Sequence, residues 1–341
     1  MKKLSIVMPV FNCTEYVRVM IDSILANDFQ DWELLAVDDG SEQDTLDLLA
    51  GYAERDSRIK FLQRDREPKG AQTCRNIGFE RAEGEYIIFF DSDDYISPTC
   101  LGNRVSQLDS RPELDFMVFP SGVLENGEIS TAEPKFCFGY DIFDDCIVMF
   151  AERILPFVVV NNIYRTESLR RHSITWDTNL RSMQDADFNL QTLLSGMHYS
   201  FAKCTPDYGY RRSGSADSVS KKIFSDQHLQ SHQYGLEKFC SSIQTVYGNR
   251  YDRNLYDQTI YMFNQICKTS FNAVYVNGLC DILKRHNRSF GRKFALQIKL
   301  LTSLSRFLPY RFVRRVVFYS YLKYYSNITS RYKPEKISSQ L

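Results

Sequence analysis

The sequence predicts an α/β fold, in which a mostly parallel sheet is flanked by helices and followed by a helical C-terminal region. Two observations lead to this prediction. In the first part of the chain, short apolar runs alternate with stretches whose apolar residues recur at helical spacing. From Phe224 onward the chain has few glycines or prolines, and its pattern is mostly helical.

Four short apolar runs have the pattern of strands that are buried on both faces, as in parallel sheets: Leu4–Val10, Trp32–Val37, Ile59–Gln63 and Tyr86–Phe90. Three segments of helical periodicity separate them: Glu15–Ala26, Thr45–Tyr52 and Gln72–Ala82. This alternation is typical of a doubly wound sheet. Ligands of such sheets gather at the carboxyl ends of the strands, so the polar residues that follow the runs are candidate site residues.

The next hundred residues are less regular. We expect a strand over 116–119, a loop or hairpin over 122–139, a strand over 158–164 and a helix over 186–194. Near the C-terminal end, Pro309 is expected to separate two helices, because proline cannot continue a helix interior.

Composition narrows the class of protein. The formal net charge is zero, yet residues 284–336 hold fourteen lysines and arginines and one acidic residue. The nine cysteines form no C-x-x-C pair, so we expect buried free thiols in a reducing cytosol. There is no apolar stretch of about 18 residues, and the apolar start of the chain is interpreted as a buried strand rather than a signal peptide.

An acidic cluster, Asp91-Ser92-Asp93-Asp94, follows the fourth predicted strand. Like charges beside a buried strand are costly unless a cation or hydrogen bonds compensate. Mg²⁺ and Mn²⁺ prefer oxygen ligands and leave coordination positions for substrate phosphates. The cluster therefore indicates a divalent-metal and nucleotide site, and a solvated acidic turn is the alternative.

Four segments, in this order, carry a resemblance to a known family: SIVMPVFNCTEYV (5–17), LLAVDDGSEQDT (34–45), KGAQTCRNIGFERAEGEYIIFFDSDD (69–94) and QDADF (184–188). They resemble the nucleotide-sugar glycosyltransferases of family 2, of the bacterial polysaccharide type, which have the GT-A fold. The resemblance implies a GT-A domain over 1–220, with a nucleotide-sugar-binding half (1–100) and an acceptor-binding half (101–220). Residues 221–341 would form the helical region.

The resemblance places the turn after the first strand along the base and ribose, and its assigned residues are Pro9, Val10, Phe11, Asn12 and Glu15. A capping loop, in which Asn12 or Thr14 satisfies free amides, is the alternative.

Further contacts follow from the same resemblance. Asp39 would accept a hydrogen bond from the uracil imide, while Asp38 could instead orient the loop. Lys69 or Arg66 would approach the pyrophosphate, and Arg75 could brace the acidic loop.

Within the acidic cluster the family pattern puts the metal, Mn²⁺ or Mg²⁺, on Asp93. Asp91 and Ser92 would lie on the ribose side, and Asp94 would fix the loop by local hydrogen bonds. Arg211, in a Tyr-x-Tyr-Arg segment, is assigned to a phosphate; an edge strand with a mobile loop is the alternative for that segment.

An inverting transfer needs one general base, and the candidate is Asp185. Similar enzymes carry two adjacent acids here, whereas this chain has Gln184 in place of the first. Loss of that neighbouring charge would lower the pKa of Asp185 relative to a paired arrangement. Asp187 is the competing candidate.

The C-terminal segment 292–325 mixes cations with aromatic and aliphatic residues. Such a segment can lie in a membrane interface, with its cations near anionic headgroups. We expect a cytoplasmic protein, peripheral on the inner face of the cell membrane. An ordinary packed helical subdomain is the alternative, and nucleic acid is not expected because no recognised motif is present.

These observations together predict a metal-dependent inverting glycosyltransferase. It would move a sugar from a nucleotide-sugar to the hydroxyl of a glycan or lipid-linked acceptor in cell-surface polysaccharide synthesis. The expected donor is a UDP-sugar. The alternative is a non-catalytic nucleotide-sugar or glycan-binding protein on the same fold, which Gln184 keeps open. Nucleotidyl transfer is disfavoured, because residues 9–15 contain no glycine-rich phosphate loop.

Overall fold

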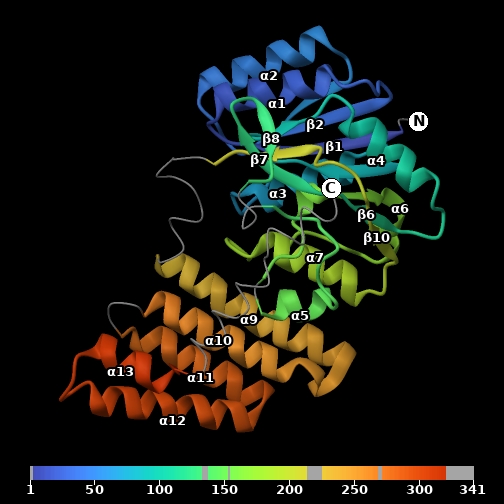
Figure 1. Ribbon diagram of the computed structural model, residues 1–341. Coiled ribbons are helices and arrows are strands. Elements are labelled where there is room, and N and C mark those ends of the chain that lie inside the picture. The colour runs from blue at the N-terminus through green and yellow to red at the C-terminus, as the bar shows by residue number, and fades with distance from the viewer. Residues whose placement is uncertain (1–2, 133–136, 153, 213–224, 268–270, 320–341) are drawn as a thin grey trace.

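A computed structural model describes residues 3–132, 137–152, 154–212, 225–267 and 271–319. The predicted α/β fold is confirmed, with a helical region beyond the sheet (Figure 1). The main sheet has seven strands in the order β10-β6-β9-β4-β1-β2-β3.

Four parallel strands form one half of this sheet, and each of the predicted runs becomes one: β1 (Leu4–Val10), β2 (Trp32–Asp38), β3 (Ile59–Gln63) and β4 (Tyr86–Phe89). β1 pairs in parallel with β2 on one side and β4 on the other. All seven residues of β1 and of β2 are buried. The carboxyl ends of β1, β2 and β4 therefore meet at one edge of the sheet.

Helices cover both faces of these strands. α1 (Thr14–Leu25) and α2 (Gln43–Arg55) lie on one face, and α3 (Ala71–Arg81) lies on the other (Figure 1). α3 approaches β1 closely at Gly78, where an added Cβ would lie 2.4 Å from a Val7 methyl carbon. This close approach brings Arg75, one turn earlier in α3, near the strand ends.

The second half of the fold is mixed, as its irregular sequence indicated. β9 (Asn162–Arg165) runs antiparallel to β4 and to β6 (Phe116–Val118), and β10 (Tyr199–Phe201) pairs in parallel with β6. The strand expected over 158–164 is thus wrong in its first part, which forms the 3-10 turn η2 (Val159–Asn161). The helices here are α4 (Cys100–Asp109), α5 (Cys146–Ala151), α6 (Thr166–Arg171) and α7 (Gln184–Leu194).

A second, four-stranded sheet lies beside the strand ends in the order β5-β11-β7-β8. Its strands are β5 (Tyr95–Ile96), β7 (Ser121–Glu125), β8 (Glu128–Ser130) and β11 (Tyr208–Tyr210). The hairpin expected over 122–139 is β7 and β8, with its turn at Asn126 and Gly127, both of positive φ. The edge-strand alternative for 208–210 is wrong, because β11 lies between β5 and β7.

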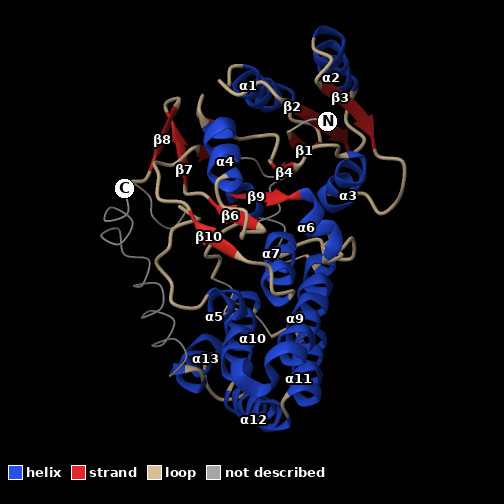
Figure 2. Cartoon of the chain, turned by 90° about the vertical axis from the view of Figure 1, so that its right-hand side faces the viewer, coloured by secondary structure: helices blue, strands red, loops and turns tan. Residues whose placement is uncertain are grey.

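The helical region follows as expected from α9 onward and lies at the end of the molecule away from the sheet (Figures 1 and 2). Its members are α9 (Asp226–Tyr247), the 3-10 turn η3 (Gly248–Tyr251), α10 (Asp252–Ile266), α11 (Ala273–His286), α12 (Arg288–Leu304) and α13 (Tyr310–Val317). Pro309 separates α12 from α13, as predicted. Within the described ranges, no helix is both long and apolar enough to cross a membrane.

Two expectations fall partly outside the described residues. The boundary expected at residue 220 lies within 213–224, and the end of segment 292–325 lies beyond Tyr319. The division into a GT-A domain and a helical region stays a prediction.

A fully buried ion pair connects α4 to the start of β11. The Arg104 guanidinium donates to both oxygens of Asp207, at 2.8 and 2.6 Å, and to the Val160 carbonyl at 2.7 Å. Neither side chain is more than 6% exposed. Because Asp207 directly precedes β11, this pair fixes the strand that runs beside the acidic loop.

We predict that Arg104→Met lowers the free energy of unfolding by about 3–5 kcal/mol, because it leaves the Asp207 carboxylate buried without its partner. Urea unfolding followed by circular dichroism measures the loss. Arg111→Met removes the exposed pair with Glu113 and is the matched control, with an expected change below about 1 kcal/mol. Equal losses in the two variants would contradict the structural role of the buried pair.

Candidate active site

The loops after β1 and β2 are joined by hydrogen bonds at the carboxyl edge of the sheet. The backbone N–H of Asn12 donates to Ser41 Oγ at 3.0 Å, and the backbone N–H of Glu42 donates to the side-chain Oδ1 of Asn12 at 2.8 Å. Asn12 has a positive φ of 46°, a conformation that asparagine tolerates better than most residues. Its side chain is thus used to hold the two loops together.

Other residues assigned to the first turn differ in their access to a ligand. The side chains of Pro9 and Val10 are buried in the sheet, and the Val10 carbonyl accepts from the Asp39 N–H at 2.8 Å. Phe11 and Glu15 are exposed. Of the turn's apolar side chains, only that of Phe11 therefore faces the space where a base could lie.

Asp38 and Asp39 have different partners. The Asp38 carboxylate accepts from the backbone N–H groups of Gly40 and Ser41, at 2.8 and 3.1 Å, and so orients its own loop. Oδ1 of Asp39 accepts from Arg64 Nε at 2.8 Å and from the Gly70 N–H at 3.0 Å. The Cys74 thiol also donates to the Asp39 carboxylate, so three residues hold this side chain at the edge of the sheet.

Two basic residues were candidates for the pyrophosphate, and their environments separate them. Arg66 forms an ion pair with Glu80 at 2.6 Å on the outside of α3. Lys69 lies with its Nζ 3.6 Å from the centre of the Phe11 ring, at the mouth of the loops. Lys69 is the cation that the fold brings to the candidate site.

The acidic loop after β4 is held by its neighbours on three sides. Both oxygens of the buried Asp94 carboxylate accept hydrogen bonds at 2.6 Å, one from the Tyr208 hydroxyl and one from the Arg211 backbone N–H. Ser92 Oγ lies 3.2 Å from Cys13 Sγ. Asp91 Oδ1 accepts from Arg75 Nη2 at 2.5 Å. These contacts fix the loop without using the Asp93 carboxylate.

Asp93 is the member of the loop suited to a cation. Burial, and then the charge of Asp91, raises the pKa of Asp93 to about 6, which means that its carboxylate is poorly solvated. Within the described ranges, no other residue donates a hydrogen bond to this carboxylate. Those ranges contain no cluster of three potential metal-binding side chains. Asp91 and Asp93 still fit a hard divalent cation, which usually takes one or two carboxylates and fills its remaining positions with phosphate and water.

Asp185 lies in the first turn of α7, next to Gln184. Burial raises the pKa of Asp185 to about 6, a shift that the Arg75 charge opposes and the Asp91 charge increases. Among the described residues, none donates a hydrogen bond to its carboxylate. Asp187, in contrast, accepts from Lys238 at 2.8 Å and from Gln191 at 2.7 Å. The geometry therefore favours Asp185 as the base and gives Asp187 a structural role.

Arg75 connects the acidic loop to the helix of the candidate base. Its guanidinium donates to Asp91 and, at 3.3 Å, to Gln184 Oε1, and it lies 4.4 Å from the centre of the Trp176 ring. Trp176 in turn stacks on Phe188 of α7 at 4.4 Å. The sequence suggested only a brace for the acidic loop, because the contact with Gln184 spans 109 residues.

Tyr210 and Arg211 close the other side of the loop. Arg211 Nε donates to the Asp93 carbonyl at 2.8 Å, and its guanidinium lies 4.9 Å from the Tyr16 ring centre. Burial, together with the charges of Asp91, Asp93, Asp94 and Asp185, raises the pKa of Tyr210 to about 12. Tyr210 thus lies near both the acidic loop and the candidate base, and the sequence interpretation did not assign it.

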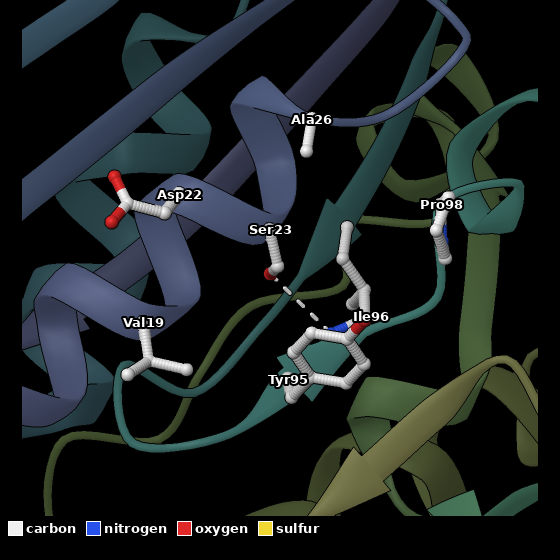
Figure 3. Close-up of a pocket in the computed structure, with 7 residues that line it drawn as sticks. All are labelled: Val19, Asp22, Ser23, Ala26, Tyr95, Ile96 and Pro98. Atoms are coloured by element: carbon white, nitrogen blue, oxygen red, sulfur yellow. Dashed lines mark hydrogen bonds between the residues drawn. The ribbon is translucent and has the colours of Figure 1, made fainter. Parts of the chain in front are cut away.

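A separate open pocket lies between α1 and β5 (Figure 3). It is lined by Val19, Asp22, Ser23, Ala26, Tyr95, Ile96 and Pro98, and none of these is a predicted site residue. Its one carboxylate, Asp22, accepts a hydrogen bond from Tyr52 at 2.6 Å. This pocket is not the crevice formed by the strand ends.

The fold and the paired carboxylates at the strand ends are those of a nucleotide-sugar glycosyltransferase of the GT-A type. Residues 5–172 match the model of the family "Glycosyl transferase family 2", and the chain belongs to this family. The predicted resemblance is confirmed.

Relatives of known name support the same placement. Over 202 residues the chain is 27% identical to the poly(ribitol-phosphate) beta-N-acetylglucosaminyltransferase TarS of Staphylococcus aureus, covering 59% of this chain and 34% of TarS. It therefore spans about a third of the length of TarS. It is 25% identical over 265 residues to the uncharacterized glycosyltransferase EpsJ of Bacillus subtilis, covering 71% of this chain and 74% of EpsJ.

Solved structures share the fold. The crystal structure of S. aureus TarS 1–349 in complex with UDP-GlcNAc superposes with a TM-score of 0.69 at 20% identity, covering 94% of this chain and 92% of that one. The mannosyltransferase PcManGT of Pyrobaculum calidifontis, in complex with GDP-Man and Mn²⁺, superposes with a TM-score of 0.52 at 15% identity, covering 94% and 85%.

We predict that Asp185→Asn stabilises the metal-free protein at about pH 7.5. Folding raises the pKa of Asp185 from its usual value of 3.8 to about 6, so the folded protein binds this proton more tightly than the unfolded chain. The resulting loss of stability is absent below about pH 4, grows as the pH rises towards 6 and is complete above it. Thermal unfolding of variant and wild type should therefore converge at about pH 4 and diverge at higher pH.

Asp187→Asn is the matched control in the same helix. Burial also raises the pKa of Asp187, but here the charge and hydrogen bond of Lys238 oppose the shift. Asp187→Asn should destabilise the protein at about pH 7.5, because it removes one of the two carboxylates that pair with the partly buried Lys238. A wild type that unfolds at a higher temperature than Asp185→Asn at this pH would contradict the uncompensated burial of Asp185.

Proposed function

We propose that this chain is an inverting glycosyltransferase that moves a sugar from a UDP-sugar to an acceptor hydroxyl. One observation carries the proposal. The poorly solvated carboxylate of Asp185, which accepts no hydrogen bond within the described residues, follows Gln184 at one end of the Arg75 bridge, and the other end of that bridge holds the acidic loop after β4. The candidate base and the acidic loop, which would lie near the phosphates, are thus connected by Arg75.

The chemistry assigned to the chain's own groups is a single displacement. The Asp185 carboxylate accepts the proton of the acceptor hydroxyl while that oxygen forms a bond to the anomeric carbon. The bond from the anomeric carbon to the phosphate oxygen breaks, and UDP leaves with the electron pair. Attack from the face opposite the leaving group inverts the anomeric configuration. A pKa of about 6 keeps Asp185 mostly ionised at neutral pH, so it is ready to accept the proton.

We propose Mn²⁺ or Mg²⁺ as the cofactor, held by Asp93 with Asp91 beside it. When bound, the cation would act as a Lewis acid that neutralises charge on the diphosphate. Lys69 and Arg211 lie at opposite sides of the loops and add positive charge near the phosphates. Arg75 keeps Asp91 in place.

The nucleotide is proposed to be uridine, read by Asp39 and covered by Phe11. Arg64 and Gly70 fix the orientation of the Asp39 carboxylate at the edge of the sheet. The exposed Phe11 ring offers an apolar face to a base. The TarS structure in complex with UDP-GlcNAc is consistent with this choice, although at 20% identity it supports the fold alone.

The acceptor is proposed to be a glycan or a lipid-linked glycan of the cell surface. TarS and the poly(ribitol-phosphate) beta-glucosyltransferase of Bacillus spizizenii are named for poly(ribitol-phosphate), a polymer that offers hydroxyl groups, and the latter is 27% identical over 224 residues, covering 64% of this chain and 34% of that protein. We further propose that transfer takes place on the cytoplasmic side of the cell membrane, with the chain attached peripherally.

We predict that Asp185→Asn lowers the rate of transfer by about 10²–10⁴-fold, the usual contribution of a general base. Affinity for UDP should stay within about 3-fold, because Asp185 is assigned to the acceptor and not to the nucleotide. The measurements are UDP release in the presence of acceptor and calorimetric titration with UDP. If Asp187→Asn abolishes transfer in folded protein while Asp185→Asn does not, the base assignment is wrong.

A second prediction concerns the cation. Asp93→Ala should weaken UDP binding about 10- to 100-fold in the presence of Mn²⁺ and leave it unchanged in EDTA, because the lost carboxylate acts on the nucleotide through the metal. Calorimetry with and without Mn²⁺ measures the difference. Asp65→Ala, which changes an exposed carboxylate outside the crevice, is the control. Equal Mn²⁺-dependent affinity in Asp93→Ala and wild type would refute the metal assignment.

The same measurements separate the enzyme from a non-catalytic binding protein on this fold. Gln184, which replaces the first of two adjacent acids in similar enzymes, would favour the binding protein only if this replacement left the site without a general base. In this structure Gln184 bonds to Arg75 and leaves Asp185 in place. UDP binding with no release of UDP from any sugar nucleotide and acceptor would favour the binding protein.

A further inference from the structure

The last two described helices are fixed to the helical region by their inner faces. Phe294 of α12 and Phe318 after α13 pack on Phe263 of α10, with ring centres 5.8 and 4.9 Å away. Tyr310 donates to the Cys267 carbonyl at 2.9 Å, and Arg314 donates to Asn264 Oδ1 at 2.8 Å. These contacts determine which side of each helix faces outward.

The outward side carries apolar residues that the helical region does not bury. On α12, Leu296, Leu300 and Leu304 recur every four residues and are exposed, opposite the buried Phe294 and Ile298. Phe307 and Leu308 in the following turn are exposed, Phe307 by 85%, and exposure continues through α13 at Phe312, Val316 and Tyr319. We call these eight residues the outer apolar surface.

An ordinary solvated helix would carry charges of both signs at these positions. Here an apolar row of this length, with Phe307 85% exposed, indicates a surface that another phase or molecule covers. α12 and α13, which carry the outer apolar surface, lie at the end of the molecule away from the sheet (Figures 1 and 2), so a partner that covers this surface would lie away from the strand ends.

The charges around this surface are all of one sign. Exposed cations flank the apolar residues, and they are Arg292, Lys299, Arg306, Arg311 and Arg315. Between residues 288 and 319 there is no aspartate or glutamate. The covering partner must therefore combine a negative surface with an apolar interior.

We propose that the outer apolar surface of α12 and α13 docks the protein on an anionic lipid bilayer, with the leucine and phenylalanine side chains among the acyl chains and the arginines and Lys299 at the headgroups. The proposal rests on the proposed function, since it says where an enzyme acting at the membrane would attach. A second copy of the chain is disfavoured, because a two-fold contact would bring the same cations together. Nucleic acid offers no apolar layer for Phe307.

Co-sedimentation of the full chain with vesicles tests the apolar part. The wild type should bind vesicles of phosphatidylcholine with about one third phosphatidylglycerol. Leu300→Ser/Phe307→Ser should reduce that partition at least about 10-fold, because two exposed apolar side chains would no longer enter the bilayer. Both residues lie outside the core, so the variant is expected to fold. Val274→Ser changes an exposed apolar residue on α11 and should bind like the wild type.

The charge part has its own variant. Lys299→Gln/Arg311→Gln/Arg315→Gln should lower binding to anionic vesicles by roughly 100-fold, from about a factor of five for each cation near the surface. The matched control, Arg81→Gln/Lys203→Gln/Arg250→Gln, removes three exposed cations elsewhere and should bind like the wild type. The wild type should bind vesicles of phosphatidylcholine alone at least about 10-fold more weakly.

Three outcomes would overturn the docking proposal. The first is that Leu300→Ser/Phe307→Ser binds vesicles as well as the wild type, and the second is that the wild type binds neutral and anionic vesicles equally. The third is that the wild type binds no vesicles and instead forms a dimer in sedimentation velocity that Leu300→Ser/Phe307→Ser abolishes. UDP release with a water-soluble acceptor is measured on every preparation. Lost vesicle binding with unchanged UDP release supports docking, whereas vesicle binding without any UDP release refutes the proposed function and leaves docking intact.

Discussion

The parallel register of β2, β1 and β4 gathers carboxylates at one edge of a buried sheet. The surrounding residues supply the hydrogen bonds and ion pairs that stabilise this negative charge. Burial penalises the charged form of each carboxylate near the strand ends, and hydrogen bonds or ion pairs offset that penalty. Asp38 and Asp94 accept backbone N–H groups, Asp39 pairs with Arg64, and Asp91 pairs with Arg75. These partners come from four different elements, so the chain is tied together around the crevice.

Two carboxylates are left without such partners in the described residues, and they are the ones assigned to chemistry. Asp93 and Asp185 have pKa values raised to about 6, in both cases mainly by burial. A buried carboxylate with few hydrogen-bond donors interacts strongly with a cation or with the proton of a hydroxyl group, which suits these two residues to their proposed roles. Arg75 pairs with Asp91, and its positive charge partly offsets the unfavourable burial of Asp185.

The helical region contributes to the catalytic half as well as to the outer surface. Lys238 of α9 bonds to Asp187 of α7 and to Asp177 in the loop before α7, so the helix of the candidate base is fixed from below. α12 and α13 pack on the far side of the same region and carry the outer apolar surface. Membrane attachment and catalysis would thus be carried by opposite ends of one packed unit.

The sequence by itself determined the parallel half of the sheet, the acidic loop and the family, because buried strands and strand-end motifs depend on neighbours in the chain. It also predicted the break at Pro309. It placed a strand over 158–164 that begins only at Asn162, since a short apolar run does not distinguish a strand from a 3-10 turn. Only the tertiary structure shows that Lys238, 51 residues away in sequence, holds Asp187, and this contact supports the proposed choice of Asp185 as the base. The bridge from Arg75 to Gln184 and the outward apolar row likewise depend on contacts between distant elements, which periodicity and motifs do not specify.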